Sequence, residues 1–304
     1  MDLGESESSS ITDILRPIIQ AMLQAPAPSL PHQIDPQALA ALPRTSGVYI
    51  FKGEGTLPLY IGKSVDIRSR VLAHLRTKDE AEMVAQSRRV DFIETAGEIG
   101  ALLLESRLIK QQNPLYNVRL RRLRKLCAIE LPHTPGGTLR IVTDKDVAIG
   151  QVDGLYGLFS SVHAAQSKLR ELADQHRLCL GVLGLEKLSQ RGCFGLQVKS
   201  CLGACVGRED RLVHDQRLLS ALQDMQVHAW PFAGAVDLIE RSGDWAQRHR
   251  IHNWRHLGTT CSRTSTFEPH TQQGFDLDTY KILAKPIMMN TALIQPVLET
   301  LGPD

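Results

Sequence analysis

Glu105 is the residue whose position in this sequence most clearly indicates a chemical role. Residues 97–112 have the periodicity of an amphipathic helix, whose apolar face would hold Ala101, Leu102, Leu104, Leu108 and Ile109. Glu105 falls near the middle of that face. Because an unpaired buried carboxylate costs several kcal/mol, we expect it to be protonated, ion-paired or bound to a metal ion. A structural salt bridge is the plain alternative; Asn117, in the turn after the helix, favours the metal because it could return to the same place.

Two tyrosines fall where a hairpin would bring them together. Hydrophobic runs at residues 47–51 and 57–61 are separated by a glycine-containing connection of hairpin length. The pattern predicts two strands, of which the first carries Tyr49 and the second Tyr60. Either tyrosine alone could be an ordinary strand residue.

A short helix is predicted directly after the hairpin. Gly62 would let the chain turn tightly, and Ser64 is a suitable N-cap for a helix with apolar residues at every fourth position from 67 to 75. Arg70 and His74 would then lie on a neighbouring face, near the strand ends. Arg70 alone would be read as a solvated surface charge, but its combination with the tyrosines and Glu105 indicates a site.

In order and spacing, these residues resemble the GIY-YIG nuclease domain, in the version found at the N-terminus of the UvrC excinuclease subunit. The matching residues are Gly47-Val48-Tyr49, Tyr60-Ile61-Gly62, Lys63, Arg70, Glu105 and Asn117. Residues 101–105 and 114–117 are similar to UvrC-type segments rather than to homing or restriction enzymes. The overall length is similar to that of the Cho-type excinucleases, which are shorter homologues of UvrC.

The resemblance implies metal-dependent hydrolysis of a phosphodiester bond in one DNA strand. Glu105 would bind a single Mg or Mn ion, and Tyr60 would be the general base. Since a tyrosine pKa lies near 10, a cation is needed to lower it, and Lys63 is the candidate. Arg70 would hold the scissile phosphate in bidentate fashion. Tyr49 and Asn117 would order the water and the metal-bound network, whereas UvrC proteins do not require a histidine at the position of His74.

The same resemblance implies a role in nucleotide excision repair. The substrate would be damaged double-stranded DNA, and the UvrB damage-recognition complex, with UvrA, would recruit the protein to cut once on the 3′ side of the lesion. No pattern of the second nuclease domain or the helix-hairpin-helix domain of full-length UvrC is visible, which favours a single incision. Two alternatives stay open, a stand-alone GIY-YIG nuclease and a non-catalytic DNA- or partner-binding module. The cysteine cluster counts against the first, and the filled catalytic positions count against the second.

Four of the six cysteines fall within 27 residues, at Cys179, Cys193, Cys201 and Cys205. In a chain without a secretion signal, such a group indicates a metal site rather than disulfides. Four thiolates suit zinc or an iron–sulfur cluster, and four unligated buried thiols are the ordinary alternative. The segment from Cys201 to Cys205 resembles the cysteine signature of UvrC proteins, which implies a 4Fe-4S cluster.

Basic residues gather after the nuclease-like segment. The net charge of +2 is too small to indicate a nucleic-acid partner, but residues 107–125 hold seven basic residues and no acidic one. Such a run is commonly a solvated linker. Here it is a candidate contact with the phosphate backbone of DNA. The candidate DNA-binding residues are Arg119, Arg121, Arg122, Arg124 and Lys125.

The patterns predict an α+β protein in four parts. Residues 1–36 would form a flexible N-terminal arm, residues 37–122 a GIY-YIG domain with a small, mostly antiparallel sheet flanked by helices, residues 123–208 a cysteine-cluster domain, and residues 209–304 a mixed α/β, Cho-like region. The first residues lack the regions of a signal peptide, and no run reaches the length of a transmembrane helix. We therefore expect a cytoplasmic protein with no membrane partner.

Overall fold

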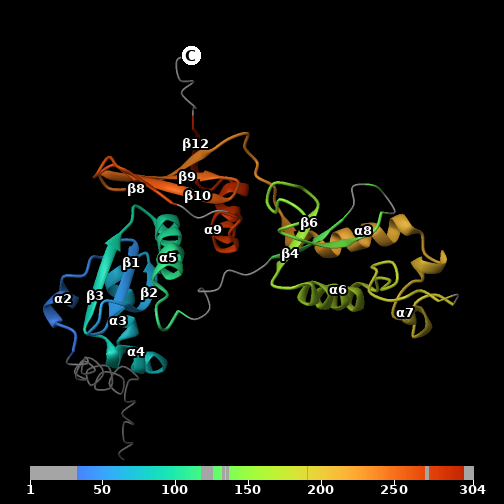
Figure 1. The fold of residues 1–304 in the computed structure, drawn as a ribbon, viewed down its shortest axis with the longest axis horizontal. Helices are drawn as coiled ribbons and strands as arrows, with labels where there is room; N and C mark the ends of the chain where they lie inside the picture. The colour runs from blue at the N-terminus through green and yellow to red at the C-terminus, as the bar shows by residue number, and fades with distance from the viewer. Residues whose placement is uncertain are drawn as a thin grey trace, which may run out of the picture.

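The structure is a computed structural model that describes residues 33–117, 126–131, 134, 137–189, 191–270 and 274–297. Figure 1 shows three lobes: an N-terminal lobe (33–117), a middle lobe (126–227) and a C-terminal lobe (236–297). Each contains one antiparallel sheet. The predicted α+β class is confirmed.

The N-terminal lobe contains a three-stranded sheet in the order β2-β1-β3. Its elements are α2 (Pro36–Ala40), β1 (Gly47–Lys52), β2 (Pro58–Ser64), α3 (Ile67–His74), η1 (Lys78–Glu80), α4 (Ala81–Gln86), β3 (Arg89–Glu94) and α5 (Glu98–Gln112). The side chains of the central strand β1 alternate between two cores, as period-two geometry requires. Val48 and Ile50 pack under α5, whereas Tyr49 and Phe51 pack toward α3.

Asp66, and not Ser64, caps helix α3. The strand β2 runs on through Ser64, and the Asp66 carboxylate accepts the main-chain N–H of Ser69 at 2.8 Å. The hydroxyl of Ser64 instead forms hydrogen bonds with the main chain of Asp66. The predicted N-cap was therefore wrong by two residues, because the strand extends further than its apolar run.

The middle lobe has a four-stranded sheet, β5-β4-β6-β7, covered by helices on one face. Its elements are β4 (Cys127–Glu130), β5 (Arg140–Thr143), β6 (Leu155–Phe159), α6 (Val162–His176), α7 (Phe194–Gln197), η3 (Ala204–Val206), α8 (Arg211–Leu222), η4 (Gln223–Met225) and β7 (Gln226–Val227). Helices α6 and α8 pack on this sheet around a core that includes Leu169, Leu218 and Leu222. The last two lie beyond the domain boundary that the sequence predicts at residue 208.

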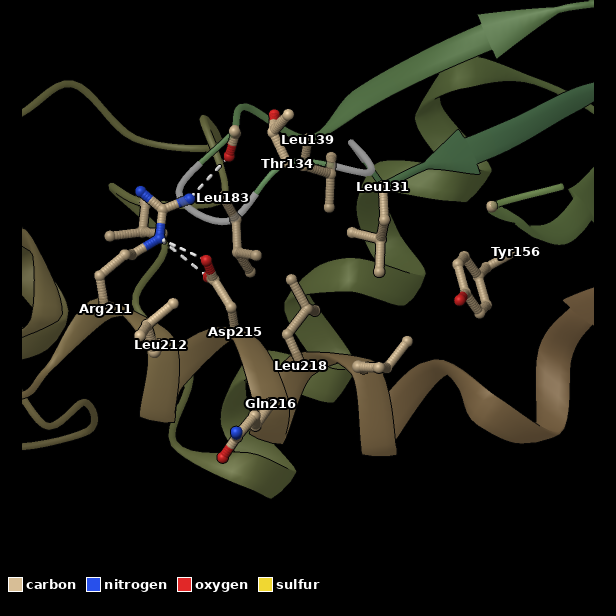
Figure 2. A pocket seen from close by; sticks show the side chains of 14 residues that line it. Leu131, Thr134, Leu139, Tyr156, Leu183, Arg211, Leu212, Asp215, Gln216 and Leu218 are labelled. Atoms are coloured by element: carbon tan, nitrogen blue, oxygen red, sulfur yellow. Dashed lines mark hydrogen bonds and ion pairs between the residues drawn. The ribbon is translucent and has the colours of Figure 1, made fainter.

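An apolar groove of about 390 Å³ lies between α8 and the start of β5. Figure 2 shows Leu131, Leu139 and Leu218 along it and Arg211 at its polar end. Arg211 donates to the carboxylate of Asp215 and to the carbonyl of Gly137, at 2.8 Å each. Because its charged groups are paired with each other, the groove offers no obvious reactive group.

The C-terminal lobe has a five-stranded sheet, β11-β10-β9-β8-β12, and one helix. Its elements are β8 (Val236–Ser242), β9 (Trp245–His252), β10 (Arg255–Cys261), β11 (Phe267–Pro269), α9 (Leu277–Met288) and β12 (Leu293–Pro296). The largest core of the described residues joins this lobe to the middle sheet and includes the fully buried Trp254. This arrangement confirms the predicted mixed α/β region.

Helix α5 is shared between the N-terminal and C-terminal lobes. Leu108 and Ile109 pack on the N-terminal sheet, whereas Leu103 lies in the core of the C-terminal lobe. Lys110 adds an ion pair to Asp276 at 2.7 Å, at the start of α9. The apolar face predicted from Leu102 and Leu104 was therefore incomplete, because α5 is covered on two sides.

Within the described part of the chain, no helix combines the length and the apolar character needed to cross a membrane.

Candidate active site

The hairpin of β1 and β2 brings both tyrosines to one face. Tyr49 pairs with Gly62 and Phe51 with Tyr60, and the ring centroids of the two tyrosines lie 6.2 Å apart. A Cβ atom at Gly62 would lie 2.8 Å from the Tyr60 ring and closer still to the Tyr49 hydroxyl. Gly62 lies within β2 and does not have a positive φ. It is needed for this close approach, and the predicted tight turn at Gly62 was wrong.

His74 links the tyrosines to a carboxylate. Its Nε2 lies 2.7 Å from the Tyr49 hydroxyl and its Nδ1 lies 2.6 Å from Oε2 of Glu80. Because an ionised carboxylate only accepts hydrogen bonds, Nδ1 carries the proton, and Nε2 accepts the O–H of Tyr49. His74 is 1% exposed, and its ring centroid lies 5.3 Å from that of Tyr60. The sequence placed His74 near the site but gave no sign of Glu80.

Arg70 lies one turn before His74 on α3, with its guanidinium exposed. It is close enough to both tyrosines to lower their pKa values, and contact with Tyr49 raises the pKa of Arg70 itself. The predicted neighbourhood of these three residues is therefore found in the structure. An exposed cation beside two hydroxyl groups can receive a phosphate from solvent.

Glu105 is half-buried on α5 and faces the end of β2. One carboxylate oxygen accepts the main-chain N–H of Lys63 at 3.0 Å, and burial raises the pKa of Glu105. Among the described residues, no side-chain cation forms an ion pair with it. Of the three states expected from the sequence, the structural salt bridge is thus not found within the described ranges, and the second oxygen is open to a metal ion.

The ammonium group of Lys63 is directed to a carboxylate and not to the tyrosines. It pairs with the carboxylate of Glu98, in the first turn of α5. The pKa of Tyr60 is raised, first by burial and then by the charge of Glu105, and the cation that opposes this shift is Arg70. The expectation that Lys63 lowers the pKa of Tyr60 was therefore wrong, because its side chain points to another acid.

Asn117 holds the edge strand β2 in place. Its amide oxygen accepts the N–H of Ile61 at 2.9 Å, and its amide nitrogen donates to the carbonyl of Ile61 at 2.8 Å. The chain before it adds main-chain bonds from Leu115 and Tyr116 to β2. The predicted return of Asn117 toward the site is found, but its contacts are with the main chain between Tyr60 and Gly62.

The predicted DNA-binding residues Arg119, Arg121, Arg122, Arg124 and Lys125 lie outside the described residues. Residues 1–32 of the predicted N-terminal arm also lie outside them.

The cysteines of the middle lobe converge in a second candidate site. The Sγ atoms of Cys179, Cys193 and Cys201 lie within 4.8 Å of one another, with separations of 3.6 Å and 3.4 Å from Cys193 to the other two. Cys205 lies beside this group of three, since its sulfur accepts the N–H of Cys193 at 3.4 Å. Burial raises the pKa of Cys201 to about 12 and that of Cys205 to about 11, so metal binding is needed to keep them as thiolates.

These donors fit a metal. A tetrahedral zinc ion with Zn–S bonds of about 2.3 Å would separate its thiolates by about 3.8 Å, close to the observed spacing. Four thiolates also suit an iron–sulfur cluster.

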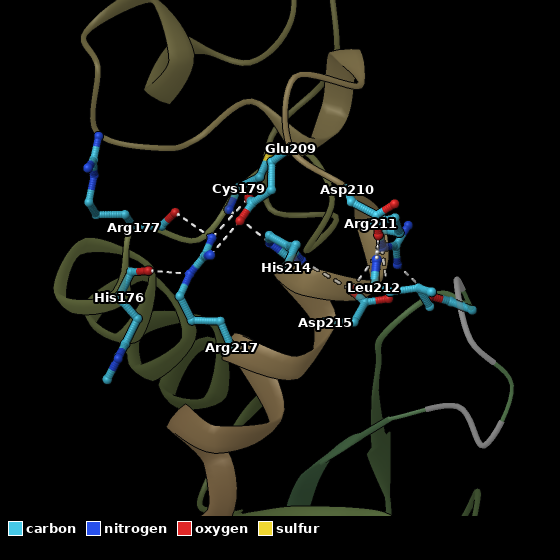
Figure 3. Close-up of polar contacts among 11 residues, drawn as sticks. His176, Arg177, Cys179, Glu209, Asp210, Arg211, Leu212, His214, Asp215 and Arg217 are labelled. Carbon is cyan, nitrogen blue, oxygen red and sulfur yellow. Dashed lines mark hydrogen bonds and ion pairs between the residues drawn. The ribbon is translucent and has the colours of Figure 1, made fainter.

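Helix α8 holds the first cysteine in place. Figure 3 shows His214 between Cys179 and Asp215: its Nε2 accepts the N–H of Cys179 at 3.1 Å, and its Nδ1 lies 3.1 Å from the Asp215 carboxylate. Arg217, one turn further on, donates to the carbonyl of His176 at 2.8 Å and pairs with Glu209. The cysteine loops are therefore fastened to two helices at one end.

Three family models match successive parts of the chain. The UvrC-like GIY-YIG domain matches residues 45–118, the UvrC/Cho excinuclease middle domain matches residues 132–224, and the excinuclease Cho C-terminal domain matches residues 235–300. Excinuclease cho of Escherichia coli (strain K12) is 51% identical over 250 residues, which cover 81% of this chain and 84% of that protein. The chain belongs to the excinuclease Cho family.

More distant relatives match smaller shares of this Cho-family chain. The UvrABC system protein C of Thermus thermophilus is 34% identical over 178 residues, which cover 57% of this chain and 29% of that protein. The solved magnesium-bound GIY-YIG N-terminal endonuclease domain of UvrC from Thermotoga maritima is 32% identical and covers 27% of this chain and 92% of that chain, with a TM-score of 0.25.

In this member of the Cho family, the C-terminal lobe caps the helix that carries Glu105. Glu240 of β8 accepts the N–H groups of Ile99 and Gly100 at 2.9 Å and 2.6 Å. The N-cap Gly97 has no side chain to do so, and a Cβ atom there would collide with Glu240. Glu240 is not among the site residues predicted from the sequence. The signal that could have found it is the pair of glycines at the start of α5, where a capping side chain would normally stand.

Proposed function

We propose that this chain is a divalent-metal-dependent DNA endonuclease of nucleotide excision repair that makes one incision on the 3′ side of a lesion in the damaged strand. Membership of the Cho family supports an excision endonuclease. The observation that carries the proposal is the convergence of Tyr60, Arg70 and Glu105 from three different elements, since the pKa of Tyr60 responds to both of the other two.

Glu105 is the residue proposed to hold the metal ion. Its half-buried carboxylate has one oxygen fixed by the main chain of β2 and one open oxygen, and hard divalent ions such as Mg or Mn prefer such ligands. When bound, the ion would supply electrostatic stabilisation of the charge that develops on the phosphate.

Arg70 is proposed to bind the scissile phosphate. Its guanidinium is exposed beside the tyrosine hydroxyls and can make two parallel hydrogen bonds to phosphate oxygens. Tyr60 is the proposed acceptor of a proton from the attacking water. Tyr49 is proposed to hold Tyr60 and this water in position. Phosphodiester hydrolysis needs a large reduction of its barrier, at about 1.4 kcal/mol for each tenfold gain in rate, so several such groups must act together.

The cysteine site is proposed to hold an iron–sulfur cluster, with zinc as the alternative. Three convergent thiols, with that of Cys205 beside them, support either metal centre. Purified protein with a cluster should be brown and contain iron and sulfide, whereas colourless protein with one equivalent of zinc would replace the cluster by zinc.

Damaged double-stranded DNA, UvrA and UvrB are proposed partners, and the cytoplasm is the proposed location. The basic residues 119–125 follow the N-terminal lobe directly in the chain and are the proposed contact with the DNA backbone. Replacing them should weaken binding to all DNA sequences alike and reduce its salt dependence.

The function is tested by an incision assay on an end-labelled duplex with one bulky lesion, in the presence of Mg. Reactions with and without UvrA, UvrB and ATP are compared for the wild-type chain and for Glu105→Gln. One nick on the 3′ side of the lesion, formed only with the partners, is the expected result. Cutting of undamaged DNA, or cutting without partners, would instead establish a stand-alone nuclease, and no cutting under any condition would favour a binding module.

A further inference from the structure

The two tyrosines of the site are poor bases by themselves. Burial raises the pKa of Tyr49 and of Tyr60, so both hydroxyls are protonated at neutral pH. A protonated tyrosine can accept a proton from water only if it passes its own proton on. A neighbouring group must therefore take that proton.

The contacts lead from Tyr60 to one such group. Tyr49 lies next to Tyr60, with ring centroids 6.2 Å apart, and lowers its pKa. The hydroxyl of Tyr49 donates a hydrogen bond to Nε2 of His74 at 2.7 Å. The other side of the imidazole is fixed by Glu80 at 2.6 Å. Glu80 lies at the end of η1 with its side chain 32% exposed, so the far end of the chain of contacts reaches solvent.

The protonation state of His74 suits an acceptor. Burial lowers the pKa of His74, which leaves the imidazole neutral at physiological pH, and the lone pair on Nε2 accepts the hydrogen bond of the Tyr49 hydroxyl. Once it gains a proton, the adjacent Glu80 carboxylate stabilises the imidazolium. A histidine held between a hydroxyl and a carboxylate has the arrangement by which proteins move a proton from a hydroxyl.

We propose that His74, oriented by Glu80, is the terminal proton acceptor of a relay that runs from the attacking water through Tyr60 and Tyr49. The proposal rests on the endonuclease function proposed above and adds two residues to it. Neither residue belongs to the set that the UvrC resemblance assigns to the reaction.

The step balances without any further reactant. As the water oxygen forms its bond to phosphorus, one water proton moves to the Tyr60 oxygen, the Tyr60 proton moves to Tyr49, and the Tyr49 proton moves to Nε2 of His74. The P–O bond to the leaving group breaks with its electron pair, and the leaving oxygen takes a proton from solvent. Both tyrosines are then neutral again, and His74 returns its proton to solvent past Glu80, which restores the neutral imidazole.

The relay predicts a specific dependence on pH. The groups that face His74 are Tyr49 of β1, Tyr60 of β2, Arg70 of its own helix and Glu80 of η1. Since only neutral His74 accepts a proton, the rate should fall as pH drops through the pKa of His74. Arg70 lowers this pKa and Glu80 raises it.

The test compares single-turnover incision rates of the wild type, His74→Gln and Glu80→Gln from about pH 5 to about pH 9. The matched controls are His163→Gln, an exposed histidine of α6, and Asp79→Asn, the exposed neighbour of Glu80. His74→Gln should lower the rate at neutral pH by about 100-fold or more and abolish the acid limb. Glu80→Gln should lower it by about tenfold and move the acid limb to lower pH, while both controls behave as the wild type.

The outcomes separate the relay from the function. An inactive wild type rejects the endonuclease function, and the relay with it. An active wild type, with a His74→Gln variant that keeps the acid limb, rejects the relay alone, even if its rate is lower at every pH. Should melting curves show that His74→Gln does not fold, Glu80→Gln decides, because its partly exposed side chain can be changed without opening the core. An unshifted acid limb in Glu80→Gln then overturns the proposal.

Discussion

The side chains of the candidate active site stand on strands and helices, whereas the cysteines of the middle lobe stand mainly on loops. Tyr60 and Arg70 belong to β2 and α3, and Glu105 lies in the middle of α5. By contrast, Cys179 follows the end of α6, Cys193 precedes the four-residue helix α7, and Cys205 lies in a single 3-10 turn. The first site is thus fixed by the hydrogen bonding of strands and helices, and the second by turns and short helical segments that are fastened to α6 and α8 at one end.

This difference gives the two proposed metal sites different roles, one in catalysis and the other in folding. At the active site, main-chain bonds from Lys63 to Glu105 and from Ile61 to Asn117 position the groups before any ion binds. Such preorganisation lets an ion come and go with the substrate. At the cysteine site, binding of the proposed metal would contribute its free energy directly to folding, because its ligands lie on turns and short segments and not within long helices or strands. The comparison therefore predicts a loss of activity at one site and a loss of structure at the other.

The largest expected effect is that of Glu105→Gln, which should reduce incision by about 1,000-fold or more because it removes the charge that holds the proposed ion. Its melting temperature should stay close to that of the wild type, because the glutamine oxygen can still accept from Lys63. Glu98→Gln, on the same helix, is the matched control and should cut normally, since its ion pair with Lys63 is exposed. A Glu105→Gln variant that cuts at the wild-type rate would remove this residue from the mechanism.

The converse result is expected for Cys193→Ser, whose sulfur lies closest to the others. The variant should fail to bind the proposed metal and become sensitive to proteolysis within residues 177–210, because the loops then lack the metal that would organise them. Cys261→Ser, a partly exposed cysteine of β10, serves as the control. Metal analysis and limited proteolysis report the outcome, and full metal content in Cys193→Ser would contradict the assigned ligand set.

Local patterns predicted a large part of the fold and of the site. The hairpin and the helix with Glu105 were found within three residues of their predicted ends. These elements have clear periodicity, since each buries one face. Tyr49, Tyr60 and Arg70 could be placed together because their elements follow one another directly along the chain.

The missed features depend on contacts that leave no local pattern. Glu240 lies 141 residues from Ile99, whose N–H it accepts, and nothing near either residue records that pairing. Strand β3 was not predicted. Its adjacent residues Phe92 and Ile93 are both exposed, so buried and exposed side chains do not alternate along this strand. The side chain of Lys63 was misplaced because an acid on another element competes for it.

Gly62→Ala tests whether the active site depends on main-chain geometry. The added Cβ would displace the Tyr49 hydroxyl and the Tyr60 ring, so incision should fall by about 100-fold even though no reacting group has changed. Gly55→Ala, in the connection between β1 and β2, is the matched control because nothing lies within 4 Å of its Cβ position. Normal cutting by Gly62→Ala would show that the tyrosines can move without cost, against the rigid site described above.

The smallest expected effect, from Glu240→Gln, tests whether the rigidity of the active site extends into the C-terminal lobe. The change removes a negative charge at the N-terminus of α5 and leaves one of two N–H groups without its acceptor. Loss of such a cap typically costs about 1 kcal/mol, so we expect a slightly lower melting temperature and a several-fold slower incision, with unchanged DNA binding. Asp244→Asn, at the exposed turn of the same hairpin, should change neither quantity. If Glu240→Gln lowers stability but leaves the incision rate intact, the C-terminal lobe supports the fold of α5 without setting the position of Glu105.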